Sequence, residues 1–309
     1  MPYEKLISGE ITGRTFQQGK RLGKGAWGSV YQARENTTRY AIKLPHLEED
    51  EIIEENLIKE AAIQREVSHP NITPVVLFDY HREALFSQRG TPFMVTPLAR
   101  TDLWNLVDDQ ISPERAYALS EGVAHAVATL HDQGIVHADI KPKNILIYKH
   151  RRMGIAGKLA DFGGAVHVNE NGAIREGEWF HMTHTYAAPE AIQSLSPTPA
   201  HDQYGWGLGV AYTAFTGIRL FGDEANSDTI HIEHPSFNLI QGKEKPLPSF
   251  ELLIPQEMTH LHEAIEPVIR RAMQIDPQAR YPTMDELLDD LRYRRRREEE
   301  KQKRQTRHL

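Results

Sequence analysis

The chain has 309 residues, a formal net charge of −7 and no cysteine. This length allows one large domain or two lobes with a sizeable core. The missing cysteines exclude disulfides, thiolate zinc sites and cysteine nucleophiles. Charges of both signs are mixed along the chain, which gives no strong case for nucleic acid as a partner. The N-terminus has no apolar stretch of the secretory type, so a cytoplasmic location is the default expectation, with delivery into another cell left open.

The first third of the chain predicts a small antiparallel sheet with one helix. From Phe16 to Leu44, β-branched and aromatic residues alternate with polar ones and are separated by glycines or the turn sequence ENTT. Residues 48–67 place apolar side chains at helical spacing among charges, and the prolines of SHPNITP end that pattern. A second strand-like segment, PFMVTPL, covers residues 92–98.

The remainder of the chain is predicted to be mostly helical. A long amphipathic helix opens at Ser112 and Pro113 and closes at Gly134. The apolar window Tyr204–Gly222 has the length of a membrane span, but its glycines and Arg219 favour a buried core helix.

Residues 292–309 are nearly all charged and have no apolar stripe to bury. We expect a solvated helix or a disordered tail here. Docking of this basic run on an anionic membrane or on nucleic acid is the less favoured alternative.

Three glycines, Gly23, Gly25 and Gly28, punctuate the strand-like region. Glycines at this spacing let the backbone approach phosphate oxygens, and Val30 beside them would cover an adenine ring. In isolation the motif equally fits a hairpin with glycine turns. A dinucleotide-binding unit is disfavoured, because there the glycines join a strand to a helix, whereas here strand-like sequence lies on both sides.

Lys43 follows Ala41 and Ile42 on a strand that should be buried. Its ammonium group therefore has to be paired or directed at a ligand, unless it is simply solvated at a strand edge. Glu60, on the helix that follows, offers the carboxylate, and such a pair would aim Lys43 at phosphates.

The stretch VHADIKPKNILI (residues 136–147) holds three functional side chains at close spacing. Asp139 is placed to orient and deprotonate a hydroxyl, and Lys141 to neutralise a transferring phosphoryl group. Asn144, with Asp161 of LADFGGA, offers oxygen ligands of the kind Mg²⁺ accepts alongside phosphates. Each residue alone is unremarkable, but the ordered set is hard to obtain by chance.

With these motifs, and with AAPE (187–190), DQYGWGLG and DPQARYPTMDELL in order after them, the sequence resembles the eukaryotic-type, or Hanks-type, protein kinase family. The resemblance implies an α+β, bilobal protein-kinase-like fold, with a small antiparallel β-sheet lobe carrying one helix, a larger mostly helical lobe, and ATP in the cleft. The implied organisation is an N-terminal extension 1–15, a kinase domain 16–291 with its lobes meeting near residues 97 and 98, and a charged tail 292–309.

The resemblance also implies roles for individual residues. The catalytic group is Asp139, Lys141, Lys43 and Glu60. The ATP-binding group is Gly23, Gly25, Gly28, Val30, Ala41, Lys43, Thr96, Leu98 and Leu146. The metal ligands are Asn144 and Asp161, for Mg²⁺ or alternatively Mn²⁺. Lys141 and Thr183 match the serine/threonine type, so the expected partner is a protein with a Ser or Thr acceptor hydroxyl; the oligomeric state stays open.

Two further matches and one departure concern packing. Asp202 resembles the residue that braces the catalytic loop, and Arg280 resembles the partner of Glu190. Gln64 stands one helical turn after Glu60, where the family usually has an apolar side chain, unless Ile63 fills that position.

Ala138 stands where the family typically has an arginine that pairs with an activation-loop phosphate through charge-assisted hydrogen bonds. Residues 161–182 contain no Ser, Thr or Tyr. The receptor for the phosphate and its usual attachment sites are thus missing together. This favours a kinase that needs no activation-loop phosphorylation. The alternatives are a pseudokinase or ATP-binding scaffold and, less favoured, a small-molecule kinase of related fold.

Overall fold

A computed structural model of the chain describes residues 5–46, 51–81, 90–107, 111–218 and 259–307. The chain divides into two compact units. Unit 1 consists of 1–68, 72–100 and 161–163, and unit 2 of 69–71, 101–160 and 164–309.

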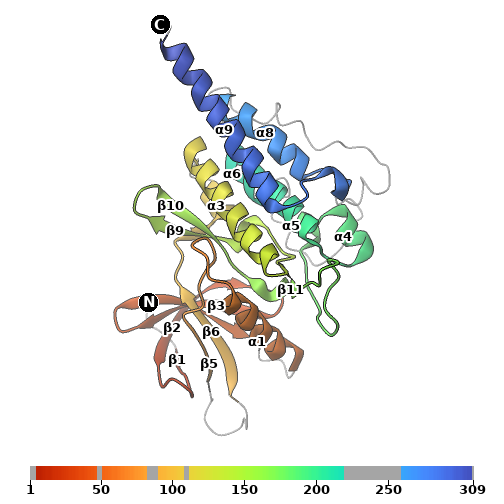
Figure 1. The fold of residues 1–309 in the computed structure, drawn as a ribbon. Coiled ribbons are helices and arrows are strands. Elements are labelled where there is room, and N and C mark those ends of the chain that lie inside the picture. The colour runs from red at the N-terminus through yellow and green to blue at the C-terminus, as the bar shows by residue number, and fades with distance from the viewer. Residues whose placement is uncertain (1–4, 47–50, 82–89, 108–110, 219–258, 308–309) are drawn as a thin grey trace. The chain divides into compact units, whose positions relative to one another are not determined.

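Unit 1 is a curled antiparallel sheet with one helix (Figure 1). Its strands, in sheet order, are β1 (Lys5–Ser8), β2 (Thr15–Lys24), β3 (Gly28–Glu35), β4 (Thr38–Pro45), β6 (Thr91–Pro97) and β5 (Leu77–His81). A bridge between Gly9 and His81 links the two edges of the sheet. The core is formed by Ile7, Phe16, Ala33, Ile42, Phe93 and Val95. Helix α1 (Glu51–Glu66) packs on the sheet, with Leu57 and Ala61 against Met94.

The predicted strands within residues 16–44 and 92–98 are present, and α1 lies within the predicted helix, whose residues 48–50 fall outside the described residues. Two edge strands, β1 and β5, were not predicted. Their sequences, KLIS and LFDYH, are too short to show a periodic pattern. Residues 1–15, which we expected to be an extension, therefore include a strand of the sheet.

Unit 2 is mostly helical, so the chain has the α+β composition expected: a small β-sheet lobe and a larger helical lobe. Its helices are α2 (Leu103–Leu106), α3 (Pro113–Asp132), α4 (Pro189–Ser194), α5 (Pro199–Gly205), the π-helical stretch Trp206–Tyr212, α6 (Thr213–Thr216), α8 (Thr259–Ala272) and α9 (Met284–Arg307). Two small sheets have the orders β10-β9-β7 and β11-β8. Their strands are β7 (Thr101–Asp102), β8 (Ile135–Val136), β9 (Ile145–His150), β10 (Gly154–Leu159) and β11 (Val166–His167).

Helix α3 begins and ends as its sequence predicts. The Ser112 side chain caps it by accepting a hydrogen bond from the Arg115 N–H, Pro113 occupies the first turn, and Gly134 follows the helix with a positive φ of 67°. Residues 204–215 of the apolar window are buried as expected, whereas Arg219 and the residues up to Gly222 lie outside the described residues. The Trp206 indole donates to the Ser120 carbonyl at 2.9 Å. Within the described part of the chain, we find no helix with the length and apolar character needed to cross a membrane.

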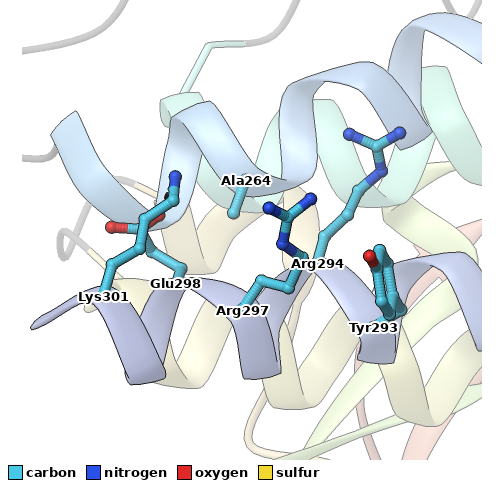
Figure 2. A pocket seen from close by; sticks show the side chains of 6 residues that line it. All are labelled: Ala264, Tyr293, Arg294, Arg297, Glu298 and Lys301. Atoms are coloured by element: carbon cyan, nitrogen blue, oxygen red, sulfur yellow. Dashed lines mark hydrogen bonds and ion pairs between the residues drawn. The ribbon is translucent and has the colours of Figure 1, made fainter. Parts of the chain in front are cut away.

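The charged tail continues α9 as a helix up to Arg307. Its first turn packs on α3: Arg292 is 2.9 Å from Glu121, and the Arg295 guanidinium lies 4.2 Å from the Tyr117 ring centroid. Between α8 and α9 the side chains leave a hollow of about 220 Å³ (Figure 2). It is lined by Ala264, Tyr293, Arg294, Arg297, Glu298 and Lys301, none of which belongs to the predicted site.

Candidate active site

The glycine-rich turn joins β2 to β3, and the Gly25 N–H donates to the Gly28 carbonyl at 2.8 Å. The two outer glycines differ in their surroundings. A side chain on Gly23 would meet no atom within 4 Å, so its backbone is open to a ligand. A side chain on Gly28 would collide with the Leu44 carbonyl of β4. Gly28 is thus required by close strand packing, a reason that the sequence motif did not distinguish from phosphate binding.

One face of the sheet in unit 1 carries four of the predicted site residues. Lys43 pairs with Val30 of β3, and Ala41 pairs with Thr96 of β6. Ile42, between them on β4, is fully buried in the core on the other face. Because side chains alternate along a strand, these four residues share the face opposite to the core.

Lys43 binds two carboxylates within unit 1. Its Nζ lies 2.9 and 2.7 Å from the two Glu60 oxygens and 2.8 Å from Asp161 Oδ1. The Glu60 side chain is 1% exposed, whereas the Asp161 side chain is 45% exposed. Lys43 thus has a buried partner, Glu60 of helix α1, and an exposed partner, Asp161.

The pKa values in this cluster follow from burial and charge. Burial opposes the charged form of Lys43, but the carboxylates of Asp161 and Glu60 outweigh it and raise the lysine pKa. Burial raises the pKa of Glu60 to about 7, with Lys43 opposing and the Asp161 charge adding to the rise. Lys43 is therefore a permanent cation, suited to binding an anionic group.

Helix α1 also holds the segment Asp161 to Gly163. The buried Asn56 amide donates to the Gly163 carbonyl at 3.1 Å, and Asp161 adopts a left-handed φ of 64°. Gln64 and Ile63, the two residues considered for the position one turn after Glu60, are both buried. The Gln64 side-chain nitrogen donates a hydrogen bond to the Thr73 carbonyl at 2.6 Å, which gives this buried amide group a partner.

In unit 2, the predicted catalytic loop lies between β8 and β9 and is braced from α5. The buried Asp202 carboxylate accepts from the backbone N–H groups of His137 at 2.8 Å and Ala138 at 2.9 Å, and it lies 3.0 Å from His131 Nε2. Ala138 is completely buried with a φ of 63°. The predicted bracing role of Asp202 is confirmed.

Four side chains of unit 2 form one hydrogen-bonded network. Lys141 Nζ lies 2.8 Å from Asp139 Oδ2 and donates to Thr183 Oγ1 at 2.6 Å. The Thr183 N–H donates to Asp139 Oδ1 at 3.1 Å. The Asn144 amide donates to the Asp139 carbonyl at 2.8 Å and to Oδ2 at 3.0 Å. Thr183 thus contacts Lys141 through its hydroxyl group and Asp139 through its backbone N–H.

The residues that would hold a divalent ion are hard oxygen donors. Both hydrogen bonds that the structure gives Asn144 use its amide nitrogen, so within the described residues its side-chain oxygen is left for a ligand. The Asp161 side chain, whose Oδ1 binds Lys43, is 45% exposed. Oxygen donors of this type fit Mg²⁺ or Mn²⁺.

The remaining predicted contacts can be placed within single units. Arg280 binds Glu190 bidentately, with Nη2 2.8 Å from Oε2, and its side chain is fully buried. Leu98 follows β6 in unit 1, whereas Leu146 lies half-buried on β9 in unit 2. The predicted site residues therefore fall into one set in each unit.

Sequence reasoning missed Asn56 and His131, whose partners are far away in the chain.

Comparison with known proteins indicates the same class of protein as the site residues do. The protein kinase domain family matches residues 16–291. The chain is 28% identical to the serine/threonine-protein kinase Aurora-1 of Arabidopsis thaliana, over 81% of this chain and 84% of that protein. It is 30% identical to the Aurora kinase of Saccharomyces cerevisiae and to mouse Aurora kinase B, over 69% of this chain in each case. The matched regions span 56% and 59% of those two proteins.

The chain belongs to the protein kinase family. It is a serine/threonine protein kinase, which transfers a phosphoryl group from ATP to hydroxyl groups of proteins and uses a divalent metal ion.

Proposed function

We propose that Asp139, Lys141, Asn144 and Thr183 form the acceptor side of the catalytic machinery, and that Lys43 with Glu60 binds ATP phosphates. The observation that carries this proposal is the network around Asp139. Its carboxylate is 8% exposed and is held by Lys141, Asn144 and the Thr183 N–H, so its orientation is set before any substrate arrives. The proposed kinase domain covers 16–291, with a charged tail after it.

In the proposed reaction, the acceptor hydroxyl oxygen bonds to the γ-phosphorus of ATP while the bond from that phosphorus to the bridging oxygen of ADP breaks. Asp139 accepts the hydroxyl proton. Lys141 and Lys43 are cations that stabilise charge on the phosphoryl oxygens, and positioning supplies most of the catalysis. Gly23, Gly25, Val30, Ala41, Thr96, Leu98 and Leu146 would bind the rest of the nucleotide.

We propose Mg²⁺ as the divalent ion, with Asn144 and Asp161 as its protein ligands. When bound, the ion would neutralise phosphate charge. The support is the chemistry of the two side chains: both carry hard oxygen donors, and the Asp161 carboxylate is on an exposed side chain.

We further propose that transfer needs no phosphate on the activation segment. Ala138 offers no cation for a phosphate, and the side chains of residues 161–182 include no hydroxyl to carry one. The protein acceptor is proposed to be a Ser or Thr residue, in line with the contact of Lys141 with Thr183.

The test is transfer of labelled γ-phosphate from ATP with Mg²⁺ to a generic Ser/Thr protein acceptor, using phosphatase-treated protein and its Asp139→Asn variant. We expect the treated wild type to be active and the variant to lose roughly 10²- to 10⁴-fold in kcat. ATP binding without transfer by the wild type would instead identify an ATP-binding scaffold. Transfer to a small metabolite but to no protein would contradict the proposed acceptor.

A further inference from the structure

Residues 164–183, here called the activation segment, are attached directly to the catalytic loop of unit 2. Strand β11 pairs with β8, which immediately precedes His137. Beyond β11 the segment turns back on itself: Val168 bridges to Ile174, and the Asn169 side chain accepts from the Ala173 N–H at 3.1 Å. The segment therefore forms a turn that is held by contacts among its own residues.

Glu178 closes this turn through two hydrogen bonds to a single residue. One carboxylate oxygen accepts from the His167 backbone N–H and the other from His167 Nδ1, both at 2.8 Å. The His167 carbonyl in turn accepts from the Arg175 N–H at 3.0 Å. Both side chains are mostly buried, with 15% of His167 and 22% of Glu178 exposed. Hydrogen bonds to a partly buried charged group are among the stronger ones.

An apolar cluster covers the position where the family arginine would stand. Ala138 packs with Val136, Val166 and Val168, and Ile174 and Phe180 of the activation segment complete the cluster. A cation at residue 138 would lie among these apolar side chains, where burial of an unpaired charge is strongly unfavourable. The activation segment thus packs on Ala138 through apolar contacts. These contacts replace the arginine–phosphate pair that is typical of the family.

The part of the segment after Glu178 leads to the acceptor network in a few residues. Gly164 approaches the His181 carbonyl so closely that a side chain there would collide with it. Two residues later Thr183 binds both Asp139 and Lys141. Residues 179–182 are therefore anchored at both ends, by His167 with Glu178 and by the network around Asp139.

We propose that Glu178 is a positioning residue whose carboxylate, bound to His167, orders the activation segment and so holds Thr183 against Asp139 and Lys141. It supplies the fixed negative charge that a loop phosphate provides in phosphorylation-dependent kinases, with a histidine as its receptor. This inference rests on the proposed function, because it explains how the segment is ordered without phosphorylation.

The test compares the kinetics of Glu178→Ala, Glu178→Gln and the wild type, all phosphatase-treated. Glu176→Ala is the matched control, since Glu176 is an exposed carboxylate of the same segment. We expect Glu178→Ala to lower kcat/KM for the protein acceptor about tenfold while the KM for ATP stays within twofold. Glu178→Gln keeps one oxygen acceptor for the His167 N–H, so this variant should fold. Its kcat/KM for the protein acceptor should lie between those of the wild type and Glu178→Ala. The kcat/KM of Glu176→Ala should match that of the wild type.

Hydrogen exchange supplies a second readout that does not depend on activity. The Thr183 amide should exchange faster in the Glu178 variants than in Glu176→Ala, while amides of the α3 core stay unchanged. If the wild type is active and both Glu178 variants match the control in kinetics and exchange, this inference is wrong and the proposed function stands. If the treated wild type is inactive and a phosphate on Thr183 or Thr185 restores it, the proposed independence of phosphorylation is wrong.

Discussion

The backbone at Ala138 shows how a single residue is held in an unfavourable conformation. A non-glycine residue with a φ of 63° costs about 1–3 kcal/mol and persists only where surrounding contacts determine it. Here the N–H groups of His137 and Ala138 both donate to Asp202. These two hydrogen bonds to Asp202 offset the conformational cost at Ala138. They also fix the start of the loop that carries Asp139.

We predict that Asp202→Asn lowers the free energy of unfolding by about 2–3 kcal/mol near pH 7. An asparagine side chain has only one oxygen for the two N–H donors, so its amide would face one of them. The Asp202 side chain is 1% exposed, so water cannot replace the lost bond. Urea unfolding of both proteins measures the difference, with Asp132→Asn, an exposed acid at the end of α3, as the control.

The stability difference between the wild type and Asp202→Asn should depend on pH. Burial alone would raise the pKa of Asp202, but hydrogen bonding from His131 and the charges of nearby histidines outweigh it and lower the pKa. A lowered pKa in the folded state contributes stability that is present above the unfolded value, near 3.8, and is lost as the pH falls through the folded value. The stability difference between wild type and Asp202→Asn should therefore shrink as the pH falls below 4. A difference that grows below pH 4 would contradict this assignment.

Among the elements, α9 combines a buried part with a solvated part. Leu287, Leu288 and Leu291 are buried, and no apolar residue except Tyr293 follows them before Arg307. The first residues of the predicted tail nevertheless contact α3, and Figure 1 shows α9 running beside α3 and continuing beyond its end. The boundary near residue 292 is therefore a change in sequence composition within one helix.

We predict that truncation after Leu291 lowers the melting temperature, whereas truncation after Lys301 has no measurable effect. The shorter protein loses the pairing of Arg292 with Glu121 and the stacking of Arg295 on Tyr117. Exposed contacts of these kinds contribute about 1 kcal/mol or less each, so a fall of about 2–6 °C is expected. Equal melting temperatures for the two truncations would show that the contacts with α3 do not stabilise the fold.

At the scale of the whole molecule, the residues proposed to bind the nucleotide and the metal are distributed over the two units. Lys43 and Asp161 belong to unit 1, and Asn144 belongs to unit 2. A ligand that binds only the folded chain stabilises it by mass action, by about 2.7 kcal/mol at a concentration 100 times its Kd. Binding of ATP to the proposed residues would therefore stabilise the folded chain measurably.

We predict that a non-hydrolysable ATP analogue with Mg²⁺ raises the melting temperature by about 5–10 °C. Removal of the divalent ion with EDTA, or the substitution Asn144→Ala, should abolish most of this shift. Lys43→Ala should reduce it through loss of a phosphate-binding cation. Replacement of Mg²⁺ by Mn²⁺ tests the choice of ion, and an unchanged shift in EDTA would argue against a metal bound together with the nucleotide.

The kinase class, the fold class and the candidate site residues can be predicted from local signals: glycine spacing, helix caps and the short motifs around Lys43, Asp139 and Asp161. Ala138 and the missing hydroxyl groups of residues 161–182 also favour an activation segment that needs no phosphate. How that segment is ordered could not be predicted in this way. His167 and Glu178 lie eleven positions apart in a stretch without regular periodicity, and no local pattern pairs them. The same holds for Asn56 with Gly163 and for His131 with Asp202: each contact depends on segments brought together by packing, which a linear pattern does not encode.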